Sequence, residues 1–482
     1  MKKTVLVFCA SLVFATNMGI KSSLADDTPL VVESGYMDFV SANKEQQHKT
    51  NNAKQNSKNK TVTVSALEAV KMAGDMVYKG DYENAQGILT KLPQTNNLPI
   101  EIERWYLLAQ IEQKKGNIDE AIKIYRKILD DQPDLVKIRY ELAICYMMKQ
   151  KWYRADYQLR LAMAGKDIPD AVKQQMMYLR YVARQNKNWN VWFNFGAAPD
   201  TNVNQATGGK ECIVNSWGEF CRYLPEPERV IGTNLSLGGN YEFKLSKHHW
   251  RWKSDAFVYT NVYNKHKYDD LYLSASTGPR YIWERGDVWL AGVVNRRWYG
   301  RNGYNWAYGA KLDTNYDFTR KLSGGLSLRT MENKYDEYGE YMDGQSYSLN
   351  PHIAYSFGAS KYAVLRGSVE RETAKMDAYA NWKYGTSFGF GAELMYGFNV
   401  YLEPYFSWVS YDDEKWVVKD NTFMPVRERD FVQRYSVSLS NNKLEIWGFV
   451  PTLTFSYTKK DSNIHSREYD KWTTEFTFQQ RF

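Results

Sequence analysis

The chain has 482 residues with a net charge of +8, so it is long enough for more than one domain. Its mean hydropathy is −0.60, and after the first segment no run reaches the roughly 18 apolar residues that a membrane helix requires, which excludes later membrane-spanning helices. The positive charge suits nucleic acid, an acidic membrane surface or an acidic partner, and the export signal at the start of the chain argues against nucleic acid.

The first segment is typical of a secretory signal peptide. Lys2 and Lys3 precede an apolar run over residues 5–15, and the stretch 23–25 reads Ser-Leu-Ala, which resembles a cleavage site. We therefore predict a signal peptide over residues 1–25 and a mature chain that begins near Asp26.

Residues 26–62 contain the stretch "SANKEQQHKTNNAKQNSKNK", which is rich in Lys, Asn and Gln and almost free of apolar side chains. Such a segment cannot bury enough surface to offset the entropy lost on ordering, so we predict a disordered polar tether. A basic arm with a binding role is the alternative.

Residues 63–188 have helical periodicity and an internal repeat. The stretches "YKGDYENAQGILTKLP", "KKGNIDEAIKIYRKILDDQP" and "MKQKWYRADYQLRLAMAG" align at steps of 36 and then 34 residues. This period resembles the tetratricopeptide repeat, in which small residues lie where paired helices cross. We predict about three repeats, whose concave face binds extended or helical segments or which serve only as a plug or spacer. The predicted packing residues are Ala73, Ala85, Trp105, Ala109, Gly116, Ala121, Tyr125, Ala143 and Ala155.

From Trp189 the period changes to two, with apolar residues on one face of each segment and small or polar residues on the other. Aromatic residues make up 15% of the chain and follow this alternation, which suits the interfacial girdles of a membrane barrel better than a carbohydrate or nucleic-acid surface. For the last stretch, "TTEFTFQQRF", taken alone, an edge strand of a soluble sandwich is the alternative. The residues predicted to line the lumen are Asn234, Ser236, Asn240, Ser387, Glu393, Thr452 and Thr454.

Short turns and longer polar loops alternate along this region. Six short turns and seven longer loops require fourteen strands, with both ends of the barrel on the short-turn side. The predicted fold is therefore an α+β multidomain chain: an N-terminal α-helical tetratricopeptide-like repeat domain followed by a 14-stranded antiparallel transmembrane β-barrel over residues 189–482. The last strand, which closes the barrel, carries Trp472, Phe476, Phe478 and Phe482 on its apolar face.

The first long loop holds two of the three cysteines of the mature chain, Cys212 and Cys221. Because the periplasm is oxidising and these residues are nine apart, we predict a local disulfide, while Cys145 lies in a helical pattern and is expected to be a buried small hydrophobe. The loop begins with Asp200, Asn202 and Asn204, residue types that form local turns. The sequence leaves open whether this loop plugs the lumen or forms an outer contact surface.

A search for catalytic and metal-binding patterns finds none. The six histidines are scattered without the spacing of metal ligands or of a nucleophilic triad, so no catalytic residue, metal or cofactor is predicted. An outer-membrane lipase or protease is supported by architecture alone. The histidines are His48, His248, His249, His266, His352 and His465.

Three stretches of the barrel region carry a family resemblance: "DTNVNQAT" at 200–207, "NRRWYGRNGYNWAYGAKLDTNYDF" at 295–318, and the chain from "RERDFVQRYSV" at 427 to its last residue. In order, they resemble the surface lipoprotein assembly modulators, or Slam proteins, also described as a type XI secretion system. The resemblance covers essentially the mature chain, and the tether at 41–60 is not part of it.

The resemblance implies an outer-membrane translocon, not an enzyme, that moves partner proteins from the periplasm to the surface of a Gram-negative bacterium. The implied partners are a cargo lipoprotein or small secreted barrel protein encoded nearby, often for host interaction or iron and haem capture. The lipid bilayer, the outer-membrane assembly machinery and periplasmic chaperones are further candidates, and nucleic acid is not expected. The competing hypotheses are a surface attachment factor or receptor acting through its loops, and a passive pore. The identity of the cargo, its route through the lumen or a lateral seam, and the energy source stay open.

Overall fold

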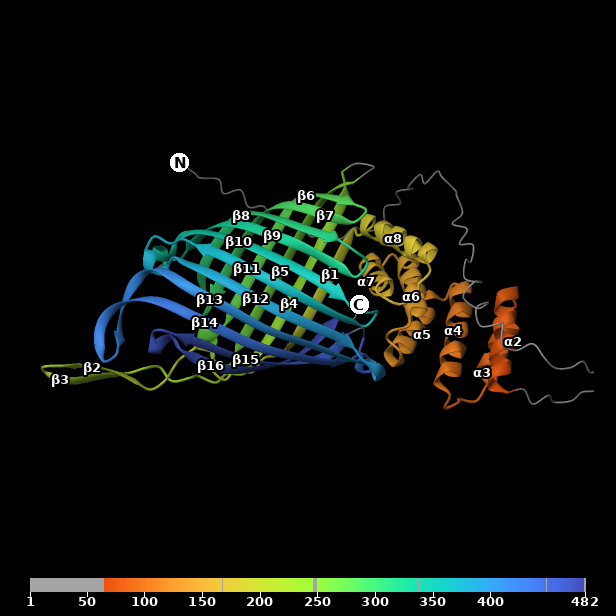
Figure 1. Ribbon diagram of the computed structural model, residues 1–482, viewed down its shortest axis with the longest axis horizontal. Helices are drawn as coiled ribbons and strands as arrows, with labels where there is room; N and C mark the ends of the chain where they lie inside the picture. The colour runs from red at the N-terminus through yellow and green to blue at the C-terminus, as the bar shows by residue number, and fades with distance from the viewer. Residues whose placement is uncertain (1–64, 167, 246–248, 337–338, 448, 481–482) are drawn as a thin grey trace, which may run out of the picture. The chain divides into compact units, whose positions relative to one another are not determined.

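The computed structural model describes residues 65–166, 168–245, 249–336, 339–447 and 449–480. The predicted signal peptide, the tether, His48, His248 and Phe482 lie outside these ranges. All described residues belong to one unit, from Val64 to Phe482. Figure 1 shows its two parts, a group of helices and a barrel of strands.

Seven helices precede the barrel in the described part of the chain and pack as consecutive pairs. Ser65 and Glu68 form a capping box at the start of the first helix. Gly80 and Gly116 adopt positive φ at the turns inside the first two helix pairs. Gln150 takes the same left-handed conformation at the turn of the third pair, where its Cβ makes this conformation less favourable than it is for glycine. The helices are α2 Ala66–Lys79, α3 Tyr82–Lys91, α4 Leu98–Lys114, α5 Ile118–Asp131, α6 Val136–Met148, α7 Trp152–Met163 and α8 Asp170–Gln185.

Small residues let the paired helices approach closely. The six alanines named from the repeat, together with Tyr125, are completely buried, and Trp105 packs against the same core. Tyr125 also donates to Gln113 Oε1 at 3.1 Å, which satisfies its buried hydroxyl. None of the described helices is long and apolar enough to cross a membrane.

Fourteen antiparallel strands close into a barrel, as predicted. Each strand pairs with its neighbours in sequence, and β1 closes the ring by pairing with both β4 and β16. The strands are β1 Trp189–Ala197, β4 Gly232–Lys244, β5 Trp250–Tyr263, β6 Asp270–Trp283, β7 Gly286–Tyr299, β8 Asn302–Asp317, β9 Leu322–Tyr335, β10 Gly344–Ser356, β11 Lys361–Glu372, β12 Asn381–Glu393, β13 Phe398–Lys419, β14 Thr422–Asn441, β15 Phe449–Ser462 and β16 Tyr469–Gln480.

The strands bury their polar face and expose their apolar face. On β4, Leu235, Leu237 and Tyr241 are exposed, whereas Asn234 and Ser236 are buried. A soluble protein would reverse this order, and the inversion is that of a barrel in lipid.

Two loop regions differ from the sequence expectation. The stretch 411–427, predicted as a polar loop, continues β13 and β14 as a long hairpin with a tight turn at Asp420 and Asn421, both at positive φ. Its charged residues pair across the two strands, as Lys415 does with Glu428 at 2.6 Å, and these pairs stabilise the hairpin. The same charged residues made this stretch resemble a polar loop in the sequence. The first long loop contains a second hairpin, β2 Lys210–Asn215 and β3 Gly218–Tyr223.

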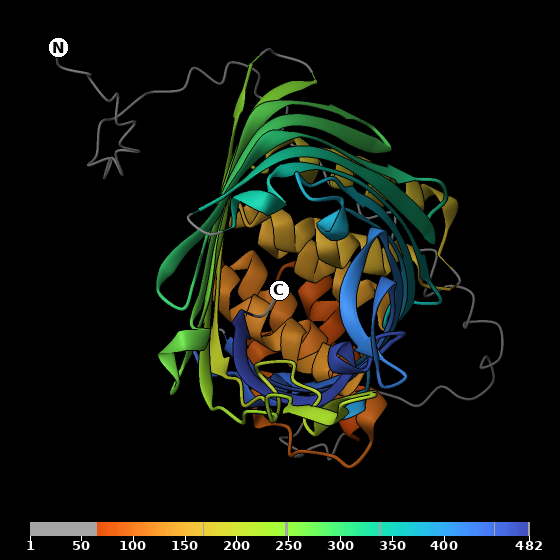
Figure 2. The same cartoon turned by 90° about the vertical axis from the view of Figure 1, so that its left-hand side faces the viewer.

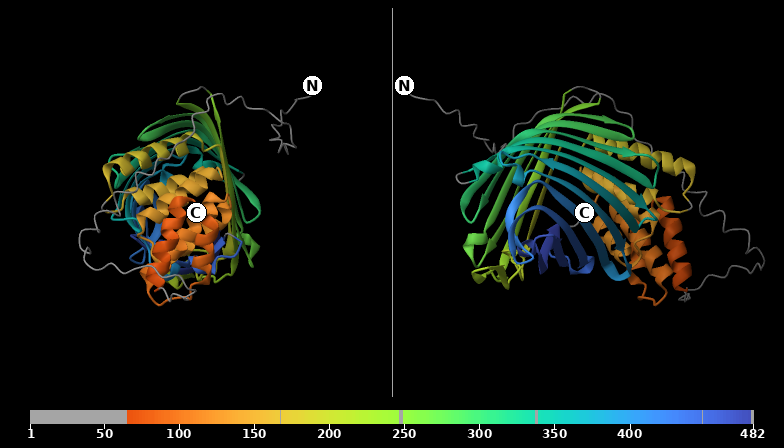
Figure 3. Two further views of the ribbon diagram at one scale, coloured as in Figure 1. Left: turned by 90° about the vertical axis from the view of Figure 1, so that its right-hand side faces the viewer. Right: turned by 60° about the vertical axis from the view of Figure 1, so that its left-hand side comes forward.

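The helices lie across one open end of the barrel, and the β2–β3 hairpin lies at the other. Viewed along the barrel, α5 to α8 lie across its far opening in Figure 2 and in front of it in the left panel of Figure 3. The short turns predicted from the sequence are at the helical end, and two-residue turns also join β7 to β8 and β13 to β14 at the other end.

Candidate functional site at the helix–barrel junction

The helices contact the barrel through side chains on α5 to α8, and we call this surface the helix–barrel junction. Its contacts reach β4 and β5, the end of β8 and the turns after β10, β12 and β14, so they are spread around the rim. The pairs across the junction are Arg126–Glu445, Asp131–Lys443, Asp134–Ser360, Arg139–Glu393, Tyr157–Glu393, Asp170–Arg320, Arg180–Asp317, Arg184–Asp317, Tyr153–Asn240 and Gln185–Arg251.

Arg139 on α6 is fully buried at the junction, as is Arg251 of β5, and each has 1% of its surface exposed. The guanidinium of Arg139 donates to Pro133 O and Gln158 Oε1, both at 2.9 Å, and forms an ion pair with Glu393 on β12. Tyr157 Oη donates to the second carboxylate oxygen of Glu393 at 3.1 Å. Each guanidinium nitrogen of this buried arginine therefore has a hydrogen-bond acceptor, as a buried charge requires, and one of these acceptors belongs to the barrel.

A second cluster ties α7 and α8 to the end of β8. Arg180 donates to Asp156 at 3.0 Å and to Asp317 at 3.1 Å, and Lys187 pairs with Asp156 at 2.7 Å. Burial alone would raise the pKa of Asp156, but the charges of Lys187, Arg180 and Arg184 outweigh it and hold the pKa far below its ordinary value. The carboxylate therefore stays ionised and keeps the three cations together at the rim.

A cavity of ≈ 360 Å³ lies inside the junction, between α5–α7 and the wall formed by β11 to β16. Its lining includes Arg139 and Glu393 together with Asn399, Ser440 and Thr452 from the barrel. This mixture of charged and hydroxyl groups makes a wet space directly beneath the helices.

The wall of β4 to β8 carries a buried network of inward charges. Arg280 donates to both oxygens of Glu242 at 2.8 Å and to Asp287 at 3.0 Å. The ammonium nitrogens of Lys253 on β5 and Lys311 on β8 each lie 4.0 Å from the centre of the Trp289 ring on β7. Arg280, Glu242 and Asp287 satisfy one another, so this side of the lumen is a polar wall.

The predicted lumen residues lie on inward positions of their strands, and two of them form hydrogen bonds to the helices. Asn240 bonds Tyr153 of α7, and Glu393 bonds α6 and α7. The others bond within the wall, as Thr454 does with Ser438 at 2.8 Å and Ser387 with Glu403 at 2.9 Å. Asn234, Ser236 and Thr452 are also buried in the wall.

Cys212 and Cys221 form a disulfide that joins β2 to β3. The structure answers the question left open for this loop, because every residue of β3 is exposed and the hairpin contacts the tip of β13–β14 through Val214 N and Asn421 O at 2.9 Å. The hairpin is therefore an outer protrusion rather than a plug. Cys145 is buried, with its pKa raised to about 12 by burial and by Glu141.

The residues Asp200, Asn202 and Asn204 hold the start of the first loop in place. Asp200 and Asn202 are buried, and Asn202 bonds Ala206 in both directions, at 2.8 and 2.9 Å. Asn204 bridges to Glu226 O and Glu228 N, each at 2.8 Å.

On the closing strand, Trp472, Phe476 and Phe478 all project from the outer face of β16. Phe478 stacks on Phe195 of β1 with ring centres 5.0 Å apart.

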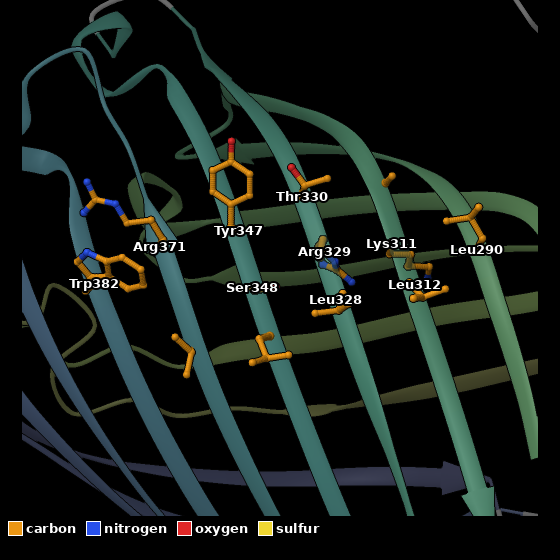
Figure 4. A pocket seen from close by; sticks show the side chains of 13 residues that line it. Leu290, Lys311, Leu312, Leu328, Arg329, Thr330, Tyr347, Ser348, Arg371 and Trp382 are labelled. Atoms are coloured by element: carbon orange, nitrogen blue, oxygen red, sulfur yellow. The ribbon is translucent and has the colours of Figure 1, made fainter.

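Figure 4 shows a groove of ≈ 550 Å³ on the outer wall over β7 to β12. Leu290, Leu312, Leu328 and Tyr347 line it, whereas Lys311 on the same wall contacts Asp255. This groove belongs to the apolar outer belt, and its lining also includes Lys311, Arg329, Thr330, Ser348 and Arg371.

The described residues hold one group with metal-ligand chemistry, formed by Cys212, Glu219 and Cys221. Two of its members are joined in the disulfide, so they cannot act as thiolate ligands.

Sequence reasoning missed most of the junction. Arg139, Arg180 and Arg184 were not among the predicted site residues, although an arginine within the largely apolar helix α6 was a signal that a buried acceptor faces it.

Comparison with known proteins follows the two parts of the chain. Residues 189–482 match the family model "Surface lipoprotein assembly modifier", and residues 102–145 match a tetratricopeptide repeat model. A surface lipoprotein assembly modifier of Pasteurella multocida is 22% identical over 78% of this chain and 75% of its own length. Surface lipoprotein assembly modifier 1 of Neisseria meningitidis is 27% identical over 76% of this chain and 73% of its own length. Among solved structures, the outer membrane channel DcaP of Acinetobacter baumannii aligns with 60% of this chain and 96% of its own, at 7% identity and a TM-score of 0.35.

Proposed function

Because the chain belongs to the surface lipoprotein assembly modifier family and is an outer-membrane barrel with its helices in the periplasm, we propose that it moves specific partner proteins from the periplasm to the cell surface. The proposed partners are surface lipoproteins or related secreted proteins. Roles of those partners in host contact or in iron and haem capture are part of the same proposal. It assigns no catalytic step to this chain.

The observation that carries the proposal is the helix–barrel junction. A repeat domain of the kind that binds peptide segments is fixed over the periplasmic mouth of a barrel by contacts on several sides of the rim. A partner that binds these helices is thereby held at the entrance of a polar lumen. A passive pore has no use for such a domain at its mouth.

A second candidate function is supported by the β2–β3 hairpin. Trp217, Phe220 and Tyr223 are exposed there on the outer protrusion, with exposures of 87, 57 and 86%. Exposed aromatic side chains of this kind are common in binding surfaces. In this alternative, the chain is itself a surface receptor that acts through its loops.

Co-expression in a laboratory bacterium with an outer membrane separates the two. The chain is produced together with the lipoprotein or small barrel protein encoded beside it, and intact cells are stained for that neighbour. The translocon proposal predicts a surface signal that depends on the chain and is lost when residues 63–186 are removed, while the hairpin variant Trp217→Ala leaves it unchanged. A neighbour that remains periplasmic beside a correctly assembled barrel contradicts the proposal.

A further inference from the structure

The line at which the barrel closes is much shorter than every other strand interface. Among the described residues, the ladder between β1 and β16 is four residue pairs long, from Asn194↔Gln479 to Ala197↔Phe476. The thirteen other interfaces in the ring are each at least nine residue pairs long. Since paired residues are the unit of sheet stability, this seam has the weakest ladder of the ring among the described residues.

Two features lie at the end of this ladder. Pro199 lies two residues after β1 and has no N–H group to donate, so the ladder is interrupted there. Pairing resumes in register at the bridge Asp200↔Thr473, where Thr474 N donates to Pro199 O at 3.2 Å and Thr201 N to Trp472 O at 3.1 Å. Gly196 lies close against β16, since a Cβ at this position would be 2.1 Å from Phe476 O.

The start of the first loop adds side-chain hydrogen bonds to this bridge, and we call this the first-loop clasp, residues 200–207. Asp200 Oδ2 accepts from Lys471 Nζ at 2.8 Å, and Asn202 Nδ2 donates to Asp470 O at 3.1 Å. Thr201 Oγ1 accepts from Trp472 N at 2.9 Å. The same residues are anchored on the other side, where Asp200 and Val230 exchange main-chain hydrogen bonds at 2.9 and 3.0 Å.

The clasp has the chemistry of a reversible closure. Asp200 and Lys471 form an ion pair that crosses the seam with side-chain exposures of 7 and 19%, and the other bonds join side chains to the main chain or main chain to main chain. A ladder of four pairs, a single bridge and separate side-chain bonds can part in steps, whereas twelve consecutive pairs, as between β15 and β16, open together.

Parting the seam in a membrane exposes main-chain N–H and C=O groups of β1 and β16 to lipid. Each unsatisfied group costs several kcal/mol there, so an open seam must be filled by something that supplies both donors and acceptors. An extended polypeptide does so by pairing as an added strand, and its apolar side chains can face lipid beside Phe195 and Phe478. Acyl chains offer no such groups.

We propose that the β1–β16 seam is the route by which the transported protein leaves the barrel, and that an extended segment of that protein pairs with the freed edges of β1 and β16. This inference rests on the proposed function and specifies the site at which it occurs. The first-loop clasp sets how readily the seam opens.

A reversible tether across the seam tests the inference. Asn194→Cys with Gln479→Cys places two cysteines at facing positions of the ladder, within the reach of a disulfide. The control is Ser438→Cys with Thr454→Cys, whose hydroxyls lie 2.8 Å apart between β14 and β15 and whose tether leaves the seam free. Oxidation is applied to intact cells after assembly, so that the same folded barrel is compared before and after tethering.

We expect oxidation to abolish surface display of the neighbouring lipoprotein by the seam variant, reductant to restore it, and the control to display under both conditions. Display by the tethered seam variant at the level of the untethered chain overturns the lateral route and leaves the proposed function intact. Failure of the unmodified chain to display the neighbour overturns the proposed function and this inference with it.

A stalled substrate provides a second, independent readout. A neighbour carrying single cysteines and a tightly folded trailing domain should form mixed disulfides with Asn194→Cys alone and fewer with Ser438→Cys alone, which lies on the lumen wall. Equal capture at the lumen position overturns the seam route. The variant Asn202→Ala should speed deuterium uptake at Asp470–Trp472 and leave β8–β9 unchanged, and unchanged uptake at 470–472 removes the clasp from the proposal.

Discussion

Replacing Glu393 by Ala tests the helix–barrel junction most sharply. The change removes the acceptor of two groups, the guanidinium of Arg139 and the hydroxyl of Tyr157, and leaves the arginine buried without its charge partner. Loss of one partner from a buried ion pair costs about 3–5 kcal/mol, and because 22% of the Glu393 side chain is exposed, we expect about 2–3 kcal/mol. At 1.4 kcal/mol per tenfold, the undocked form should become roughly 30- to 140-fold more populated.

Hydrogen–deuterium exchange of the assembled protein measures this change. Peptides from α6 and α7 should take up deuterium faster in Glu393→Ala by a factor within that range, while peptides from β8 and β9 keep their rates. Glu120→Gln is the matched control, because its ion pair with Lys123 is exposed and should leave exchange unchanged. Equal rates in Glu393→Ala and the parent protein would show that the helices are held by something other than this pair.

Three further predictions address other parts of the chain. The pKa of Asp156 is depressed, so its ion pairs stabilise the helices fully at pH values above the ordinary pKa of 3.8 and progressively less as pH falls below it. The unfolding temperature of the helices should therefore stay constant from neutral pH to about pH 5 and fall below about pH 4. Asp156→Asn should flatten that drop, and an equal drop in both proteins contradicts the assignment. Cys145, whose pKa burial raises to about 12, should resist maleimide near neutral pH in the native protein and react on denaturation, as mass spectrometry of the intact chain will show. Replacing Cys212 and Cys221 by Ser should destabilise the β2–β3 hairpin by about 2.5 kcal/mol, because the disulfide no longer restricts the unfolded loop. Proteolysis at 208–225 should become faster while barrel assembly is unchanged. Equal proteolysis of the two proteins would show that contact with β13–β14 alone holds the hairpin.

The fold could be predicted from the sequence because both of its signals are local and repeated. Small residues such as Ala109 and Ala143 recur where paired helices cross, and apolar residues such as Leu235 recur at every second position of the strands. The hairpin at 411–427 was missed for the same reason, since its charges break the alternation and are satisfied only across the paired strand, as by Lys415 and Glu428.

The site could be predicted only in part, because it depends on contacts between distant segments. Glu393 was expected to face the lumen, but nothing near it in sequence indicates that Arg139, 254 residues earlier, is its partner. In the same way, Asp200 and Asn202 were identified as turn formers, while their role at the seam depends on Lys471 and Asp470 at the other end of the barrel. Periodicity specifies elements, and tertiary structure decides which polar residues meet.

The most direct test of the central claim uses the purified full-length protein in lipid vesicles with the neighbouring lipoprotein supplied on the side of the helices. If the chain moves proteins across the membrane, the lipoprotein becomes accessible to protease on the opposite side only in vesicles that contain the chain, and less so with Glu393→Ala. A lipoprotein that stays on the side of addition, with the barrel folded and the helices docked, would contradict the account.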